Sequence, residues 1–346
     1  MLLRASHWLA LLFCNIAQNI LPLTSAGKKL LSILFKALIL VLAFVFIYHQ
    51  FLKKGPDIER FEYLLQAIGK NQVWLIMSLI FGLMLVNWLL EALKWRYVTR
   101  KLVPLSFWKA IECVFCGLTW AIFTPNRLGE YGGRVMFLPP RKRIHGMFAM
   151  AVGSFGQNVI TNVLGATGIV WFIFGFLHFN PWILLGILLI SIVYIALFML
   201  AYFNMQWVVF LLNKVPFLKK YHRFFEVMGK YDRVELVDVM LFCLARFFTF
   251  SFQYYILIHL FIPQLPAYQI LLMTFIVFFI QSALPSLDLL DVAVRSSVAA
   301  TVFAYVTNQQ IAVISVFAAI WFINLIIPAI LGSVFTFKLK FFDRNL

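Results

Sequence analysis

The sequence predicts an all-α, polytopic membrane protein with two inverted-topology repeats, and three observations support this fold class. First, 63% of the 346 residues are hydrophobic and only 12% are charged, whereas soluble domains average about 45–50% and about 25%. Second, apolar runs long enough to cross a bilayer recur along the chain. Third, lysines and arginines gather in particular loops. The composition excludes a soluble enzyme, a nucleic-acid-binding protein and a disordered chain.

Six apolar runs have the length of a single transmembrane helix, which needs about 20 residues. The run at 147–177 is long for one span, so it either tilts or breaks near Gly153–Gly156. Tryptophans and tyrosines near several run ends fit the membrane–water interface. The six runs are Leu30–Leu52, Val73–Leu93, Met147–Leu177, Trp182–Phe203, Val239–Phe261 and Ile311–Phe337.

Two further apolar stretches, Phe107–Leu138 and Gln269–Val306, contain proline and charged residues and do not form simple spans. Their placement follows from the preference of Lys and Arg for the cytoplasmic side. With the N-terminus inside, the basic segments that flank 107–138 both lie inside. The uncharged loops and the basic C-terminus place both ends of 269–306 outside. Each stretch therefore enters and leaves on one side, which predicts a re-entrant helical hairpin.

This orientation explains the formal net charge of +16. Twenty of the 29 Lys and Arg residues fall on the inner side and four on the outer side. A basic chain could indicate nucleic-acid binding, but here the excess follows membrane orientation. We therefore expect both termini in the cytoplasm and no nucleic-acid partner.

The order of spans and hairpins is repeated with opposite orientation, in a first repeat at about 73–177 and a second at about 239–337. Inverted repeats of this kind are common in secondary transporters. We expect a single membrane domain over 28–337. An interfacial or disordered extension, 1–27, precedes it, and a cytoplasmic tail, 338–346, follows it.

Both predicted hairpins contain a proline, then an acidic residue, and an arginine four residues beyond the acid. A charge at the bilayer centre costs roughly 2.5–3.5 kcal/mol, so these residues point to an internal polar cavity. The arginines would attract an anionic head group, while the carboxylates hold them or take up a proton. Alternatively, the pairs are structural salt bridges that pin each hairpin.

Amides near the hairpins leave the same choice open, because they could line the cavity or hydrogen-bond between helices. Asn162, one turn beyond Asn158, belongs to this group. The residues expected to bind or translocate the substrate are Arg127, Glu130, Arg134, Asp288, Asp291, Arg295, Asn126, Gln157, Asn158 and Gln281. The residues expected to shape the hairpin backbones are Pro125, Gly129, Gly132, Gly133 and Pro285.

No group of residues predicts catalysis or metal binding. Cys113 and Cys116 form a CxxC, but no second pair and no nearby histidine at zinc spacing accompany it. The six histidines do not cluster. The sequence contains no nucleotide-binding loop and no hydrolase or zinc-protease motif. We therefore expect no catalytic residue, no metal, no cofactor and no enzymatic activity.

The segment TPNRLGEYGGR, with NWLLEALKW at 87–95 before it, resembles the first signature of the lysylphosphatidylglycerol synthase transmembrane-region family. This family includes the flippase half of the MprF proteins and YbhN-type membrane proteins. Its second signature is matched only in part, since Asp291 replaces the usual Glu and the glycines are absent. The first pattern, P-x-R-x-GE-x(3)-R, is met at Pro125, Arg127, Gly129, Glu130 and Arg134.

The resemblance covers roughly 28–337 and implies two inverted halves with re-entrant helices, in a bacterial inner membrane. It also implies translocation of a lipid. Together with the charged hairpins, this predicts a flippase-like translocase for an anionic or modified phospholipid or a lipid-linked glycan. Two alternatives remain open: a non-transporting accessory to a partner enzyme of lipid or glycan synthesis, and a secondary transporter of a small anionic solute.

Overall fold

The chain divides into two units, residues 1–48 and 49–346, and every described residue belongs to the second unit. The predicted span 30–52, the extension 1–27 and the tail 338–346 lie outside the described residues. The computed structural model describes residues 70–122, 124, 127–216, 222–284 and 288–337.

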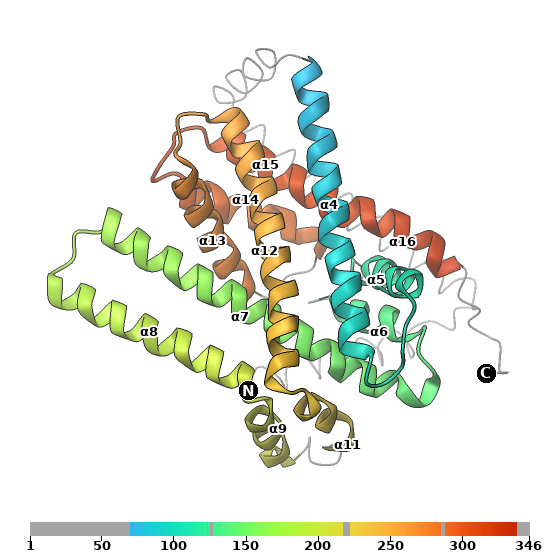
Figure 1. The fold of residues 1–346 in the computed structure, drawn as a ribbon. Coiled ribbons are helices and arrows are strands. Elements are labelled where there is room, and N and C mark those ends of the chain that lie inside the picture. Colours follow the sequence, from blue (N-terminus) through green and yellow to red (C-terminus); the bar gives the residue numbers. More distant parts are fainter. Residues whose placement is uncertain (1–69, 123, 125–126, 217–221, 285–287, 338–346) are drawn as a thin grey trace, which may run out of the picture. The chain divides into compact units, whose positions relative to one another are not determined.

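The described residues form helices joined by turns and contain no strand (Figure 1). The elements are α4 (Lys70–Thr99), α5 (Phe107–Ala121), α6 (Leu128–Val135), η1 (Pro140–Lys142), α7 (Arg143–Phe176), α8 (Pro181–Phe203), α9 (Met205–Lys214), α11 (His222–Phe225), η2 (Glu226–Lys230), α12 (Arg233–Phe261), α13 (Ala267–Ala283), α14 (Asp288–Phe303), α15 (Gln310–Trp321), η3 (Phe322–Ile326) and α16 (Ile327–Phe337).

Within the described residues, four helices are long and apolar enough to cross a membrane, judged by length and composition. Two shorter apolar helices, Ala267–Ala283 and Val292–Phe303, accompany them. These features are compatible with the predicted helical membrane bundle. The four long helices are Asn71–Thr99, Pro140–Phe176, Pro181–Phe203 and Gln310–Phe335.

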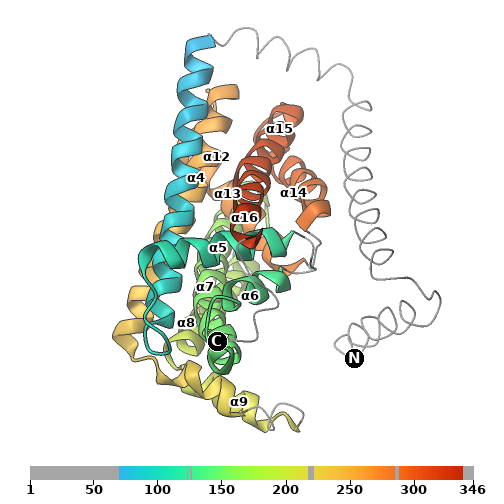
Figure 2. The same ribbon diagram turned by 90° about the vertical axis from the view of Figure 1, so that its right-hand side faces the viewer.

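Helices α4 and α12 lie side by side and run antiparallel (Figures 1 and 2). Near the end of α4, the Tyr97 hydroxyl donates a hydrogen bond to Asp238, close to the start of α12. Toward the other end, the Gln253 amide of α12 donates to the Ile80 carbonyl of α4 at 3.2 Å. Both helices extend beyond the predicted spans, and their shared face carries the polar residues described below.

The two stretches predicted as hairpins each form a pair of packed helices, α5 with α6 and α13 with α14. α5 begins at Ser106, whose side chain accepts a hydrogen bond from the Lys109 backbone N–H at 3.3 Å. The first pair also packs against α16, and α13 packs against α7. Each pair therefore contacts a long helix from the other half of the chain.

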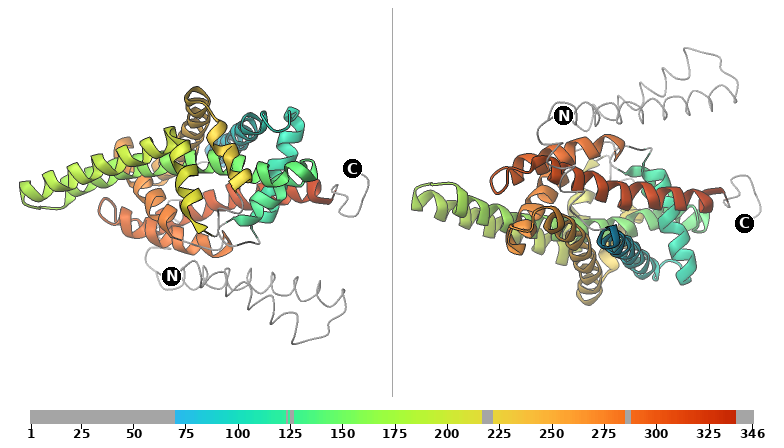
Figure 3. Two further views of the ribbon diagram at one scale, coloured as in Figure 1. Left: turned by 90° about the horizontal axis from the view of Figure 1, so that it is seen from below. Right: turned by 90° about the horizontal axis from the view of Figure 1, so that it is seen from above.

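Helix α7 is one continuous helix, so the long apolar run does not break near Gly153–Gly156. α8 returns beside it after a short turn and begins with Asn180 capping the Trp182 backbone N–H at 3.0 Å (Figure 3). Tyr202 is the buried residue of α8, and most of this helix presents apolar side chains outward.

The last predicted span contains a π-helical turn, η3, between α15 and α16. A π turn leaves a backbone carbonyl without its usual helical partner. The Asn324 side-chain amide donates to the Ile320 carbonyl at 3.1 Å and to the Gln253 side-chain oxygen at 2.8 Å. Because Gln253 in turn bonds to α4, these amides join three helices within the apolar core.

Candidate functional site

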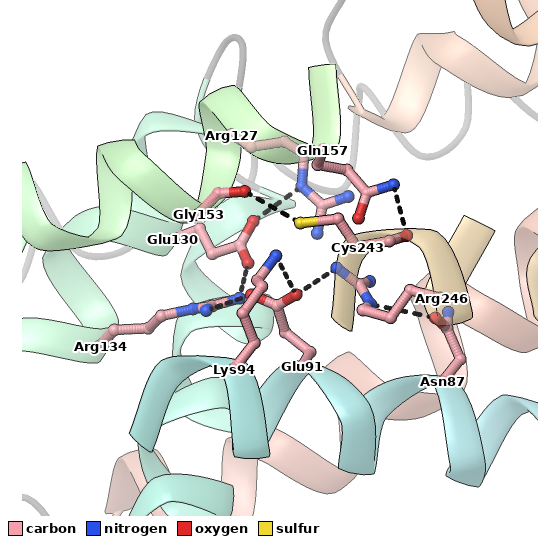
Figure 4. Close-up of polar contacts among 10 residues, drawn as sticks. All are labelled: Asn87, Glu91, Lys94, Arg127, Glu130, Arg134, Gly153, Gln157, Cys243 and Arg246. Atoms are coloured by element: carbon pink, nitrogen blue, oxygen red, sulfur yellow. Dashed lines mark hydrogen bonds and ion pairs between the residues drawn. The ribbon is translucent and has the colours of Figure 1, made fainter. Parts of the chain in front are cut away.

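Glu91 of α4 lies at the centre of a group of charged side chains (Figure 4). Its Oε1 is 2.6 Å from Nη1 of Arg134, which α6 supplies. Its Oε2 pairs with Nζ of Lys94, one turn later on α4, at 2.8 Å. The same Oε2 also pairs with Arg246 of α12. One carboxylate therefore binds cations from three helices.

Arg134 connects Glu91 to a second carboxylate. The other terminal nitrogen of Arg134 pairs with Glu130, one turn earlier on α6, which forms the acid–arginine pair that the sequence spacing predicts. Oε2 of Glu130 is 3.0 Å from Nε of Arg127. Arg127 precedes the first residue of α6 with φ 56° and ψ 26°. It is the one non-glycine residue with positive φ among those described, and such backbone strain is often found at functional sites.

Among the described residues, the resulting buried ion cluster has four cations and two carboxylates. Arg127, the most exposed of them at 36%, also has an interaction outside these pairs. Burial of an ion costs several kcal/mol unless partners compensate for it. The Arg134 side chain is 1% exposed and that of Glu91 is 5% exposed. The cluster comprises Glu91, Lys94, Arg127, Glu130, Arg134 and Arg246.

Donors outnumber acceptors within the cluster. Nε of Arg134 is buried and has no acceptor among the described residues. The guanidinium of Arg134 lies 5.9 Å from the Trp95 ring centroid, and that of Arg246 lies 5.3 Å from the Trp88 ring centroid. Cation–π contacts of this kind stabilise the cations, but they use the face of the guanidinium and leave its N–H groups available. The cluster can therefore accept a further anion.

Close glycine packing positions α6. A Cβ on Gly133 would lie 2.7 Å from the Gly117 Cα of α5 and 3.0 Å from the Cys116 carbonyl oxygen. A Cβ on Gly129 would lie 2.7 Å from Oγ1 of Thr124. A Cβ on Gly132, in contrast, would lie 4.0 Å from Cε3 of Trp120, which is ordinary contact distance. Gly129 and Gly133 thus permit the close approach that sets Glu130 and Arg134 against α4.

Helix α7 covers the cluster through Gly153 and Gln157, which lie one turn apart (Figure 4). A Cβ on Gly153 would lie 3.3 Å from Cε of Lys94. Sγ of Cys243 donates to the Gly153 carbonyl at 3.5 Å. Nε2 of Gln157 donates to the Cys243 carbonyl, also at 3.5 Å. Oε1 of Gln157 is buried and receives no hydrogen bond from the described residues.

The other predicted site residues either lie apart from the buried ion cluster or are outside the described residues. Asn158 is exposed, and its backbone carbonyl accepts from the Asn162 side chain at 2.7 Å. Asn162 also accepts from the Tyr194 hydroxyl of α8 at 2.6 Å, a hydrogen bond between helices, which is one of the two alternatives that the sequence left open. Nε2 of Gln281, at the end of α13, is buried without an acceptor among the described residues.

The second charged motif is described only in part. Arg295 is half-buried on α14, which places Asp291 one turn before it. The side chains of Asp288 and Asp291 lie outside the described residues. The predicted positions Pro125, Asn126 and Pro285 also lie outside them.

Sequence reasoning missed Glu91, Lys94 and Arg246 as members of the site. Glu91 and Lys94 lie at the end of the apolar run 73–93, where charged residues commonly bound a span. Arg246 lies within the apolar run 239–261. A lone arginine inside 23 apolar-rich residues, 239–261, is itself the signal, because an intramembrane charge needs a partner.

A second group of ion pairs, the outer ion pairs, joins the ends of α4 and α12. Glu235 binds Arg100 at 2.8 Å and Lys101 at 2.5 Å. It also accepts from the Asp232 backbone N–H at 3.0 Å in a capping box. Burial raises the pKa of Glu235, but the hydrogen bonds from Lys101 and Arg100 outweigh this effect and hold the pKa below its ordinary value. Arg100 and Lys101 are largely solvent-exposed.

The described residues contain no group of three or more His, Cys, Asp or Glu side chains placed to hold a metal ion. Cys113, Cys116 and Cys243 are buried. The site described above consists of charged and amide side chains.

Comparison of the chain with protein-family models, with curated proteins and with solved structures gave no match. The resemblance to the lysylphosphatidylglycerol synthase transmembrane-region family stays a prediction from the motif residues. Of the motif, the structure describes Arg127, Gly129, Glu130 and Arg134. All four either join the buried ion cluster or pack α6 against α5.

Proposed function

We propose that the chain is a lipid translocase that binds the anionic head group of a phospholipid or lipid-linked glycan at the buried ion cluster. The observation that carries this proposal is the buried Nε of Arg134, which has no acceptor among the described residues and lies in a cluster of cations packed between apolar helices. Guanidinium groups match phosphate oxygens in charge and geometry. A phosphate would accept from this Nε.

The position of the cluster supports a head group that enters from the cytoplasmic leaflet. Glu91 lies eight residues before Thr99, the end of α4, or about 12 Å along the axis at 1.5 Å per residue. In the predicted orientation this end faces the cytoplasm. The head group would thus bind in the inner half of the membrane, while the acyl or polyprenyl chains remain in the bilayer.

The packing of the helices supports the proposed inverted repeats. The first proposed repeat comprises α4, α5–α6 and α7, and the second comprises α12, α13–α14 and α15–α16. The leading helices α4 and α12 pack together, and each helix pair contacts a long helix of the other repeat. Two repeats related by a pseudo-two-fold axis would produce such reciprocal contacts. We propose that the pairs are re-entrant hairpins in a bacterial inner membrane, with cytoplasmic termini.

The proposal requires no nucleotide hydrolysis, because the sequence contains no nucleotide-binding loop. Movement of the head group would be passive, proton-coupled or driven by a partner protein. The family resemblance supports the same function, since lipid translocation is what that family implies.

Lipid flipping in reconstituted vesicles tests the proposal. Arg127→Asn removes one cation of the cluster, and Asn tolerates the left-handed backbone at this position. We expect purified protein to accelerate flipping of a fluorescent phosphatidylglycerol, and we expect Arg127→Asn and Glu130→Gln to lose most of this activity. Lys142→Gln, which removes an exposed cation at η1, is the matched control and should flip like the parent.

Three results would overturn the proposal. If Arg127→Asn and Glu130→Gln both fold and flip lipid at the parent rate, the cluster is not the translocation site. If the parent protein flips no lipid but co-purifies with a stable enzyme of lipid or glycan synthesis, an accessory role replaces it. Uptake of a small anion without lipid flipping would instead indicate a solute transporter.

A further inference from the structure

The amide of Gln157 supplies a further hydrogen-bond acceptor beside a cluster in which donors outnumber acceptors. Gln157 lies one helical turn from Gly153, against which the Lys94 side chain packs. On the opposite side it bonds to Cys243, one turn before Arg246 on α12. Gln157 therefore lies one helical turn from the residue that Lys94 contacts, and it bonds to a residue one turn before Arg246 (Figure 4).

The hydrogen bond to Cys243 fixes which way the amide points. A backbone carbonyl can accept but not donate, so the group that faces Cys243 must be Nε2 of Gln157. Oε1 is then the acceptor atom of the amide. It is buried and receives no hydrogen bond from the described residues. A buried carbonyl oxygen without a donor costs free energy, so a ligand that donates to it would bind more tightly.

We propose that Gln157 makes the site selective for phosphodiester lipids whose head group carries free hydroxyls, such as a glycerol or a sugar. This inference rests on the proposed function and narrows its substrate class. The phosphate pairs with the cations of the cluster, and a hydroxyl beyond the phosphate donates to Oε1 of Gln157.

Two lipids of equal charge test this selectivity. Phosphatidylglycerol and phosphatidylpropanol share the phosphodiester and the three-carbon head group, but only the first carries hydroxyls. We expect the full chain in neutral detergent to bind phosphatidylglycerol more tightly by about three- to tenfold, the ratio that one neutral hydrogen bond supplies. Native mass spectrometry or quenching of intrinsic tryptophan fluorescence would measure the two affinities.

Gln157→Met keeps the length and volume of the side chain but removes the acceptor. We expect this variant to bind the two lipids with equal affinity. Thr167→Val is the control on the same helix, because it removes an exposed hydroxyl that bonds only within α7. It should keep the parent ratio. The comparison of the two lipids on the parent protein needs no variant and so does not depend on the folding of Gln157→Met.

The outcomes separate this inference from the proposed function. Equal binding of both lipids by the parent, or an unchanged ratio in Gln157→Met, would overturn the role of Gln157 and leave lipid binding intact. Failure of the parent to bind either lipid would overturn the proposed function as well. Competition by soluble glycerophosphoglycerol at the affinity of the lipid, with the same dependence on Gln157, would support the hydroxyl contact but assign the site to a solute.

Discussion

Two groups of ion pairs join α4 to α12, and they differ in burial rather than in chemistry. In the buried ion cluster, Glu91 and Lys94 are each 5% exposed and Arg246 is 16% exposed. In the outer ion pairs, Glu235 is 11% exposed, but its partners are exposed to 48% and 35%. Both groups combine a glutamate of one helix with cations that include residues of the other helix.

The difference in burial decides what each group can do. Solvent screens the outer ion pairs, so such contacts contribute little and vary with salt. The buried ion cluster must repay a large desolvation cost, and hydrophobic residues of similar volume often serve stability as well. The outer ion pairs are therefore a local clamp on the helix ends. Because hydrophobic residues could stabilise the fold equally well, stability alone does not explain the buried ion cluster, and a role in binding is supported.

Removal of the central carboxylate should have the largest effect on stability. Glu91→Gln leaves Arg134, Lys94 and Arg246 without their shared counter-charge. We expect it to destabilise the protein by about 3–5 kcal/mol, the usual effect of removing one partner of a buried pair. Thermal unfolding in detergent, followed by circular dichroism, would measure the loss, which should change little between 0.1 and 1 M salt because burial prevents screening.

A double variant sharpens this prediction. In Glu91→Gln/Arg246→Gln one of the stranded cations is also removed, so we expect part of the lost stability to return. The interaction free energy from the four proteins of the cycle reports the coupling between the two residues. Additive effects of the two single substitutions would mean that Glu91 and Arg246 do not interact, and would contradict the comparison of the two groups.

Packing of the first helix pair should have the next largest effect. Gly133→Ala places a methyl group against the Gly117 Cα and the Cys116 carbonyl, and we expect a loss of about 1–3 kcal/mol from overpacking. The shift of α6 should also displace Arg134 from Glu91. Gly132→Ala is the control, because that position has room for a methyl group. Equal stability of the two variants would show that close packing of α6 does not set the buried ion cluster.

The sequence predicted the helical elements and one half of the site. A helix that crosses a bilayer needs about 20 apolar residues, so such helices are visible as long apolar runs. The helices α4, α7, α8 and α12 each contain one of the predicted runs almost entirely. The pair Glu130–Arg134 was predicted because it is local, with a spacing of one helical turn.

Contacts that are distant in the sequence could not be predicted in this way. Glu91 and Arg246 are 155 residues apart, and the sequence around either residue does not indicate which residue it pairs with. The π turn at η3 likewise depends on Asn324 meeting Gln253, 71 residues away. The position of α6 against α5 depends on which glycines face a neighbour, and only the packed structure separates Gly133 from Gly132.

The outer ion pairs should give the smallest effect and the clearest pH dependence. Glu235→Gln should lower the free energy of unfolding by about 1 kcal/mol or less, and 1 M salt should reduce the difference from the parent. The pKa of Glu235 is lowered in the folded protein from the ordinary value of 4.5. Its charged form is thus favoured by folding, and the contribution is complete above about pH 4.5 and is lost as the pH falls further.

Thermal unfolding of the parent and of Glu235→Gln between pH 7 and pH 3 tests this directly. We expect a constant difference in Tm from pH 7 to about pH 5, and convergence of the two curves below about pH 4.5, because the protonated glutamate then resembles the glutamine. A difference that persists at pH 3, or one that salt leaves unchanged, would show that solvent does not screen these pairs. In that case the outer ion pairs would stabilise the protein as the buried ion cluster does, without screening by solvent. The difference in burial would then not explain a difference between the two groups.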